Sequence, residues 1–204
     1  MLQTARDVTE PYRLIRAHEA FNYTLAYTYL IGAAFWNFVG AGVFGGGTLN
    51  APLINYHEHG TFLTLNHAHT ALFGAFGLLA IGLIYFCLRY VAGDRVAFDE
   101  KLGLWAFWLY NGGLILWILL NFFPIGWQQL NAVFEHGFAY ARSMAFYETT
   151  LIWQWMRLPG DVLFAAAAVL MAWDFLIKLR PLYPRLAARL SGAHMVVVNP
   201  KPGG

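Results

Sequence analysis

The chain has 204 residues, of which 59% are hydrophobic and only 12% are charged, and its formal net charge is +2. A soluble domain carries roughly 25% charged residues, so this composition excludes an ordinary soluble protein and indicates a membrane protein. The sequence has no glycine-rich phosphate loop, zinc-type cysteine pair or basic patch interleaved with aromatic residues. Nucleotide and nucleic-acid binding therefore have no support, and we expect membrane lipid around the chain.

Four nearly uncharged stretches follow one another along the chain. Each is about long enough to cross a hydrocarbon core of roughly 30 Å at about 1.5 Å per helical residue. We expect an all-α fold, a polytopic transmembrane helical bundle that forms a single domain over residues 1–204. The expected spans are 21–44, 62–90, 102–123 and 160–178, with a cytoplasmic tail at 181–204. The glycine triplet 45–47 is expected to end the first helix, and Pro124 to kink or end the third.

The lysines and arginines are distributed unevenly over the connections between these spans. Three precede the first span, three lie around the turn between the second and third, and five lie at or after the end of the fourth. The segment 125–157 has only two, and the loop around His57 has none. Because cytoplasmic loops are enriched in Lys and Arg, we expect both termini in the cytoplasm. The His57 loop and an amphipathic surface segment, 125–157, are then outside.

Two histidines, His67 and His69, lie near the start of the second span. An α-helix turns about 100° per residue, so these side chains project about 200° apart and cannot share one metal. An imidazole on each side of an apolar helix suits two large flat prosthetic groups, each bound through a histidine nitrogen to iron. The small residues Ala71 and Gly74 would let a macrocycle lie against the helix on the His67 side. The alternative is two buried polar residues bonded to neighbouring helices.

Several segments carry a family resemblance, and they extend over about residues 25 to 180. They are AFWNFVGAGVFG at 34–45, NYHEHGT at 55–61, NHAHTALFG at 66–74, FPIG at 123–126, EHG at 135–137, YARS at 140–143 and RLPGD at 157–161. Together they resemble the C-terminal part of the large (cytochrome b) subunit of nitric oxide reductase, most of all the quinol-oxidising branch, within the haem-copper oxidase superfamily.

This resemblance implies a C-terminal fragment of a haem-copper oxidase subunit I-like fold that binds two haem b groups. His67 would be the axial ligand of a high-spin haem, and His69 one ligand of a low-spin haem. The non-haem iron of the complete enzyme takes its ligands from earlier helices, and the second histidine that ligates the low-spin haem also lies on an earlier helix. This chain does not offer those helices. The implied partners are those missing N-terminal helices of the same subunit, with quinol or cytochrome c as electron donor.

The function implied is that of a respiratory enzyme of the bacterial inner membrane, which reduces two NO to N2O and water with two electrons and two protons. The chain alone is expected not to be catalytic, since it supplies one proximal ligand at most. An oxygen-reducing haem-copper oxidase would carry the same His-x-His, and a stand-alone haem-binding membrane protein is a further alternative. The ligands of the distal metal would discriminate between the two enzymes.

Four further residues are candidates for binding. Asp161, at the outer start of the last span, either caps that helix or contacts quinol and takes up a proton. His59 and Arg142 are candidate contacts of haem propionates. His57 and His59 flank a glutamate and form either a metal pair or a solvated loop cluster. The resemblance places neither of these two histidines among the metal ligands.

Overall fold

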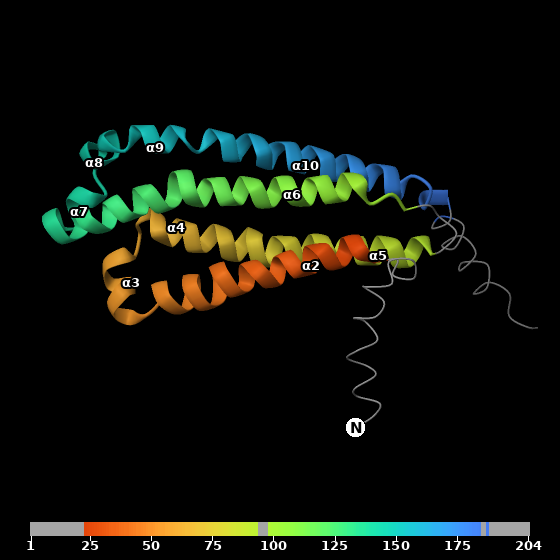
Figure 1. The fold of residues 1–204 in the computed structure, drawn as a ribbon, viewed down its shortest axis with the longest axis horizontal. Coiled ribbons are helices and arrows are strands. Elements are labelled where there is room, and N and C mark those ends of the chain that lie inside the picture. Colours follow the sequence, from red (N-terminus) through yellow and green to blue (C-terminus); the bar gives the residue numbers. More distant parts are fainter. Residues whose placement is uncertain (1–22, 94–97, 185–186, 188–204) are drawn as a thin grey trace, which may run out of the picture.

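The computed structural model describes residues 23–93, 98–184 and 187. Within these residues all regular structure is helical, and four helical rods are long and apolar enough to cross a membrane. The rods are Thr24–Leu49, Phe62–Ala92, Lys101–Ala141 and Leu151–Leu179. They run antiparallel and side by side, with the short helices α3 and α8 at one end of the bundle (Figure 1). The prediction of an all-α bundle with four spans is confirmed.

The rods are built from α-helical segments joined without loops, mostly through π-helical ones. The first rod consists of α2 (Thr24–Trp36) and η1 (Asn37–Leu49), and the second of α4 (Phe62–His69), η2 (Thr70–Gly77) and α5 (Leu78–Ala92). The third consists of α6 (Lys101–Trp117), η3 (Ile118–Phe122) and α7 (Phe123–Ala141), and the fourth of α9 (Leu151–Trp155) and α10 (Leu158–Leu179). Two short helices, α3 (Pro52–Glu58) and α8 (Met144–Thr149), lie between rods. A π-helix bonds each N–H five residues back, and such wide turns are frequent at functional sites. One of them, η2, begins directly after His69.

The first rod does not stop at its glycine triplet, as the sequence led us to expect. It continues as the π-helix η1 to Leu49. A side chain at Gly45 would collide with the carbonyl oxygen of Gly40, and one at Gly46 with that of Ala41. Glycine therefore permits this wide helix instead of ending it, because it has no Cβ to occupy the space that those carbonyls take.

Pro124 does not end the third rod either, so of the two predicted alternatives, a kink or an end, the end is wrong. The N–H of Phe123 bonds the carbonyl of Ile118, five residues back, in the π-helix η3. Pro124 then lies in the first turn of α7, where a missing N–H is tolerated best. The rod runs on to Ala141, and its only non-helical residue among these is Gly137, with φ of 81°.

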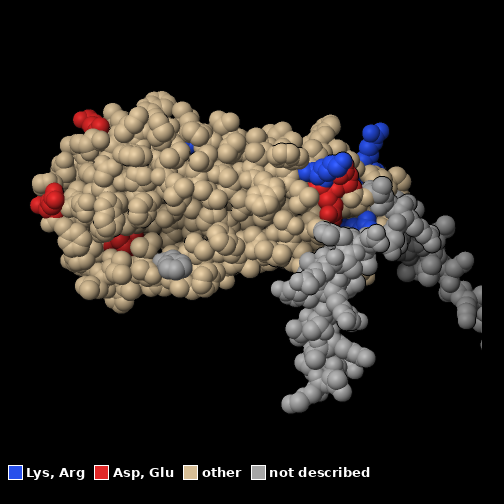
Figure 2. Space-filling view, in the orientation of Figure 1, with Lys and Arg blue, Asp and Glu red and all other residues tan. Residues whose placement is uncertain are grey.

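Buried apolar side chains fill the centre of the bundle, where α2 packs on α5 and α6 packs on α10. Large apolar side chains also cover the outside, among them Ile31, Leu72, Trp105 and Trp108. Charged residues gather towards the two ends and leave a broad uncharged belt between them on the face seen in Figure 2. Such a surface fits hydrocarbon. The predicted tail at 181–204 lies mostly outside the described residues.

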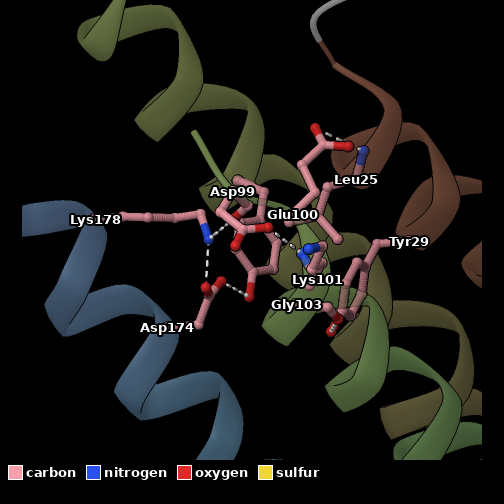
Figure 3. A network of polar contacts seen from close by, with 9 residues as sticks. Leu25, Tyr29, Asp99, Glu100, Lys101, Gly103, Asp174 and Lys178 are labelled. Carbon is pink, nitrogen blue, oxygen red and sulfur yellow. Dashed lines mark hydrogen bonds and ion pairs between the residues drawn. The ribbon is translucent and has the colours of Figure 1, made fainter. Parts of the chain in front are cut away.

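A polar network joins three helices at the end of the bundle remote from α3 (Figure 3). Lys178 and Asp174, one turn apart on α10, form an ion pair whose side chains are 5% and 2% exposed. The Tyr85 hydroxyl on α5 donates to the Asp174 carboxylate at 2.8 Å, and Lys178 donates to the carbonyl of Asp99 at 2.7 Å. Nearby, the Leu25 N–H donates to the Glu100 carboxylate at 3.3 Å. The buried charges are thus paired, which their cost in a low-dielectric interior demands.

Candidate functional site

The two central histidines occupy the last turn of α4, close to the end of the bundle that carries α3 and α8. The helix starts at Phe62, where the hydroxyl oxygen of Thr61 accepts the N–H of Leu63 at 3.2 Å and so caps it. From this capped start α4 carries His67 and His69 between the first rod and the third.

His67 faces the first rod. Its Nδ1 atom lies 2.9 Å from the carbonyl oxygen of Gly40 in η1. The ring lies against the glycine run, because a Cβ built on Gly45 would be 2.8 Å from that Nδ1 atom and one on Gly46 would be 3.5 Å from Cε1. A carbonyl only accepts, so Nδ1 carries the ring proton in this bond. The Nε2 lone pair is then available to a metal.

His69 faces the third rod. Its ring centroid is 4.5 Å from that of Phe122 and 5.6 Å from that of Trp117, which it meets edge-on at 83°. Its Nδ1 atom lies 2.8 Å from the carbonyl of Leu65, one turn earlier on α4. The same reasoning therefore leaves Nε2 of His69 as the free ring nitrogen. The two imidazoles contact different rods, as their spacing predicts.

Gly74 does not offer space for a flat ligand, contrary to the expectation from sequence. A Cβ at this position would lie 2.7 Å from Cγ of Trp36, so the indole of the first rod fills the space. Trp36 is fixed in turn, because its Nε1 donates to Asn111 on α6 at 2.7 Å. Gly40 has a similar role, since a Cβ there would collide with Thr70. Small residues at these positions bring the first two rods together.

Asp161 lies in the first turn of α10 but does not cap it. The residue before the helix is Arg157, and no side chain bonds the free N–H groups. The Oδ1 atom of Asp161 instead accepts Trp117 Nε1 at 2.9 Å and Arg157 Nε at 3.0 Å. The Asp161 side chain remains 37% exposed. The capping alternative is therefore wrong, and the carboxylate joins the last rod to the wall of the His69 site.

Only part of the segment with His57 and His59 is a loop, since His59 follows the helix α3 in an exposed turn whereas His57 does not. His57 belongs to the helix α3, and its ring lies 4.5 Å from that of Phe134 on α7. Glu58 is 1% exposed and accepts Thr64 Oγ1 at 3.0 Å. Within the described residues no group of three or more His, Cys, Asp or Glu side chains is placed to hold a metal.

Arg142 and His59 are neighbours in the structure. The Arg142 guanidinium donates to the carbonyl oxygen of His59 at 2.5 Å and lies over the ring of Phe138. Gly60, with φ of 75°, leaves room for this guanidinium, because a Cβ there would be 2.9 Å from Nη2. The structure thus brings together two candidates that are 83 positions apart in the sequence.

Nothing in the sequence singles out Trp117 or Phe122, although both contact His69. Aromatic residues make up 18% of the chain, so one more tryptophan in an apolar span carries no signal. The contact between Trp117 and Asp161 joins residues that are 44 positions apart. A single sequence gives no means of pairing them.

Comparison with known proteins gives one family and a set of distant relatives. The family of cytochrome c and quinol oxidase polypeptide I matches residues 14–163. A nitric oxide reductase polypeptide from Stutzerimonas stutzeri is 28% identical over 151 residues, which cover 71% of this chain and 31% of that protein. A cytochrome c oxidase polypeptide, subunit 1, from Rhodobacter capsulatus is 26% identical over 145 residues, which cover 67% of this chain and 26% of that protein. The chain thus spans about a quarter to a third of the length of these relatives.

Proposed function

Since the chain belongs to the family of cytochrome c and quinol oxidase polypeptide I, the haem-copper oxidase subunit I family, we propose that it is the haem-binding C-terminal part of a nitric oxide reductase. The complete enzyme would convert two NO, two electrons and two protons to N2O and water. The similarity to a nitric oxide reductase polypeptide at 28% identity supports this choice. The chain alone would not be catalytic, because the distal metal and the remaining haem ligand would come from helices outside it.

The observation that carries the proposal is the arrangement of His67 and His69. Each ring binds a backbone carbonyl through Nδ1, and each contacts a different rod. Histidines that ligate metals regularly hold their other ring nitrogen in such a bond, which fixes the ring and raises the basicity of the ligating nitrogen. This donor chemistry supports the proposal that each histidine ligates one haem b.

The two histidines would have different tasks. His67 would be the axial ligand of the high-spin haem and His69 a ligand of the low-spin haem. When bound, the two haems supply electron transfer and a binding place for the small substrate. The chain itself supplies two imidazoles in one tautomer, held apart by the backbone of α4, so that each can bind only on its own side.

Three residues at the α3 end of the bundle would contact the electron donor or the haem propionates: Asp161, Arg142 and His59. Asp161 would accept a proton from quinol, because its partly exposed carboxylate lies next to Trp117 and hence to the His69 site. Arg142 and His59 would contact haem propionates, since a guanidinium binds carboxylates in a charge-assisted manner. The proposed donor is quinol, although cytochrome c would deliver electrons to the same haem.

An oxygen-reducing oxidase is the second candidate, and the similarity to cytochrome c oxidase subunit 1 at 26% identity favours it. Both enzymes would use this His-x-His. The ligand set of the distal metal separates them, and that set would lie on the helices that precede this chain.

The membrane orientation is part of the same proposal. Arg89, Lys101, Lys178 and Arg180 lie at the ends of the rods where α5 and α10 stop and α6 starts, whereas Arg142 and Arg157 lie towards the opposite end. By the positive-inside rule the first end faces the cytoplasm of a bacterial inner membrane. The His67 and His69 site would then lie towards the outer face.

Two substitutions test the haem assignment in the complete enzyme that contains this chain. His67→Ala removes the only protein ligand of the high-spin haem, so the CO-binding band should disappear while the low-spin absorption remains. His69→Ala should remove the low-spin absorption and keep the CO-binding band. His57→Ala, in α3, is the matched control and should change neither spectrum. If both central substitutions gave the same spectrum, or neither altered haem content, the assignment would be wrong.

A further inference from the structure

Trp117 is the side chain that links the last rod to His69. It ends α6, and its indole is 7% exposed. One edge of the indole meets the His69 ring, with centroids 5.6 Å apart and planes at 83°. On the other side its Nε1 donates to Oδ1 of Asp161 at 2.9 Å. A single aromatic side chain thus contacts both a proposed haem ligand and a carboxylate near the surface.

Four residues of the last rod hold this indole in place. Asp161 takes its N–H, and Phe164 stacks on it with centroids 4.7 Å apart and planes at 23°. The Arg157 guanidinium lies 5.7 Å from the ring centroid, within the range of a cation–π interaction. Gly160 leaves the space that the indole occupies, because a Cβ there would collide with Cδ1 of Trp117. Packing or a hydrogen bond thus restrains the indole of Trp117 at each of these four contacts.

His69 needs such a neighbour more than His67 does. The ring of His67 is bonded to another rod, at Gly40, whereas among the described residues the ring of His69 is bonded only to Leu65 of its own helix. The bond to Leu65 sets the tautomer of His69, but no second rod is bonded to its ring. Trp117 and Phe122 are the aromatic walls that the third rod presents to it.

We infer that Trp117 is a positioning residue that sets the orientation of the His69 imidazole, and that Gly160 and Asp161 hold Trp117 for this purpose. This inference rests on the proposed function in so far as His69 ligates a low-spin haem. It gives the RLPGD segment a role in the site, since Arg157, Gly160 and Asp161 all contact the same indole. Supporting groups of this kind orient a metal ligand and tune the metal through it.

The test uses the complete enzyme and the electron paramagnetic resonance spectrum of its oxidised low-spin haem, whose g values depend on the orientation of the axial imidazole plane. Trp117→Phe keeps a ring but removes the N–H, and Asp161→Ala removes the acceptor while leaving the indole. Both should shift the largest g value by more than its line width. The double variant should shift it no further than the larger single shift, because both substitutions break one bond.

Two control variants sharpen this result. Asp161→Asn retains an Oδ1 acceptor for the indole and should keep the wild-type g values. Trp105→Phe changes a tryptophan that is 64% exposed on the same helix and should also keep them. Unchanged g values in both Trp117→Phe and Asp161→Ala would overturn the inference, as would an equal shift in Asp161→Asn and Asp161→Ala. If His69→Ala retained the low-spin signal, the proposed ligand itself would be wrong, which is a different outcome from a failure of Trp117 alone.

Discussion

The Nδ1 atom of His67 lies 2.9 Å from the carbonyl oxygen of Gly40, and this hydrogen bond joins the second rod to the first. The bond depends on the close approach of two backbones, because a Cβ at Gly40 would collide with the side chain of Thr70. It also depends on the π-helical turn of η1, in which Gly45 leaves the Gly40 carbonyl unobstructed. The position of one proposed haem ligand is therefore set by glycines of another helix.

Gly45→Ala should disturb the His67 site. The added methyl would collide with the Gly40 carbonyl and lie 2.8 Å from Nδ1 of His67. Overpacking of this kind costs about 1–3 kcal/mol, so we expect a lower unfolding midpoint in detergent and a weaker CO-binding band in the complete enzyme. Gly112→Ala is the control, because its new methyl would meet only Leu163 at 3.7 Å. Equal effects of the two substitutions would show that the His67 site does not depend on a glycine at position 45.

Asp161→Asn should impair quinol oxidation without disturbing the haem site. The amide cannot take up a proton from quinol, yet its oxygen can still accept the N–H of Trp117. Turnover with quinol should therefore fall at least tenfold in the complete enzyme, while NO reduction with an artificial electron donor should remain. Parallel assays with the two donors measure this. An equal loss with both would contradict a role in quinol oxidation.

Lys178→Met should destabilise the bundle strongly. It leaves the Asp174 carboxylate, 2% exposed, without its cation inside the bundle. Removing one partner of a buried pair costs about 3–5 kcal/mol, whereas replacing both partners is often neutral. The double variant Lys178→Met with Asp174→Asn should thus recover most of the loss, measured as thermal unfolding in detergent. Lys101→Met, at an exposed position, should have little effect, and a double variant as unstable as the single one would refute this account.

Glu100 predicts a pH dependence of stability. Burial raises the pKa of Glu100 above its ordinary value, against the lowering effects of the Leu25 N–H and of Arg89. The folded state then binds more protons than the unfolded state, so stability should fall as the pH rises from about 4.3 through the raised pKa. Unfolding midpoints across this window should decrease for the wild type and flatten in Glu100→Gln. Glu148→Gln, at an exposed position, should retain the wild-type slope.

The proposed membrane orientation rests on the charge distribution and is tested by reporter fusions. A reporter fused after Gly204 should be active only in the cytoplasm, and one inserted between α3 and α4 only outside it. Arg and Lys at the α6 start and α10 end supply the reason, because positively charged connections are retained inside. Periplasmic activity of the C-terminal fusion would overturn the orientation and move the His67 and His69 site to the inner face.

The sequence by itself determined the number of spans and the divergence of the two histidines. Both follow from local properties: apolar composition decides which stretches partition into lipid, and the helical repeat decides that residues two apart project to different sides. The same local rules misplaced the helix end at 45–47 and left open whether Pro124 ends or kinks the third helix. A wide π-turn accommodates glycine and proline where a regular α-helix would break, and no local sequence pattern predicted that turn.

Only the tertiary structure decided what surrounds each histidine. Gly74 lies under Trp36 of another rod, and Asp161 bonds Trp117 instead of its own helix end. In each case the sequence left more than one partner open, because a small residue can admit a ligand or a neighbouring helix and a carboxylate can cap, titrate or bond an indole. The packing of the rods selects among these partners, since it fixes which side chains meet within bonding distance.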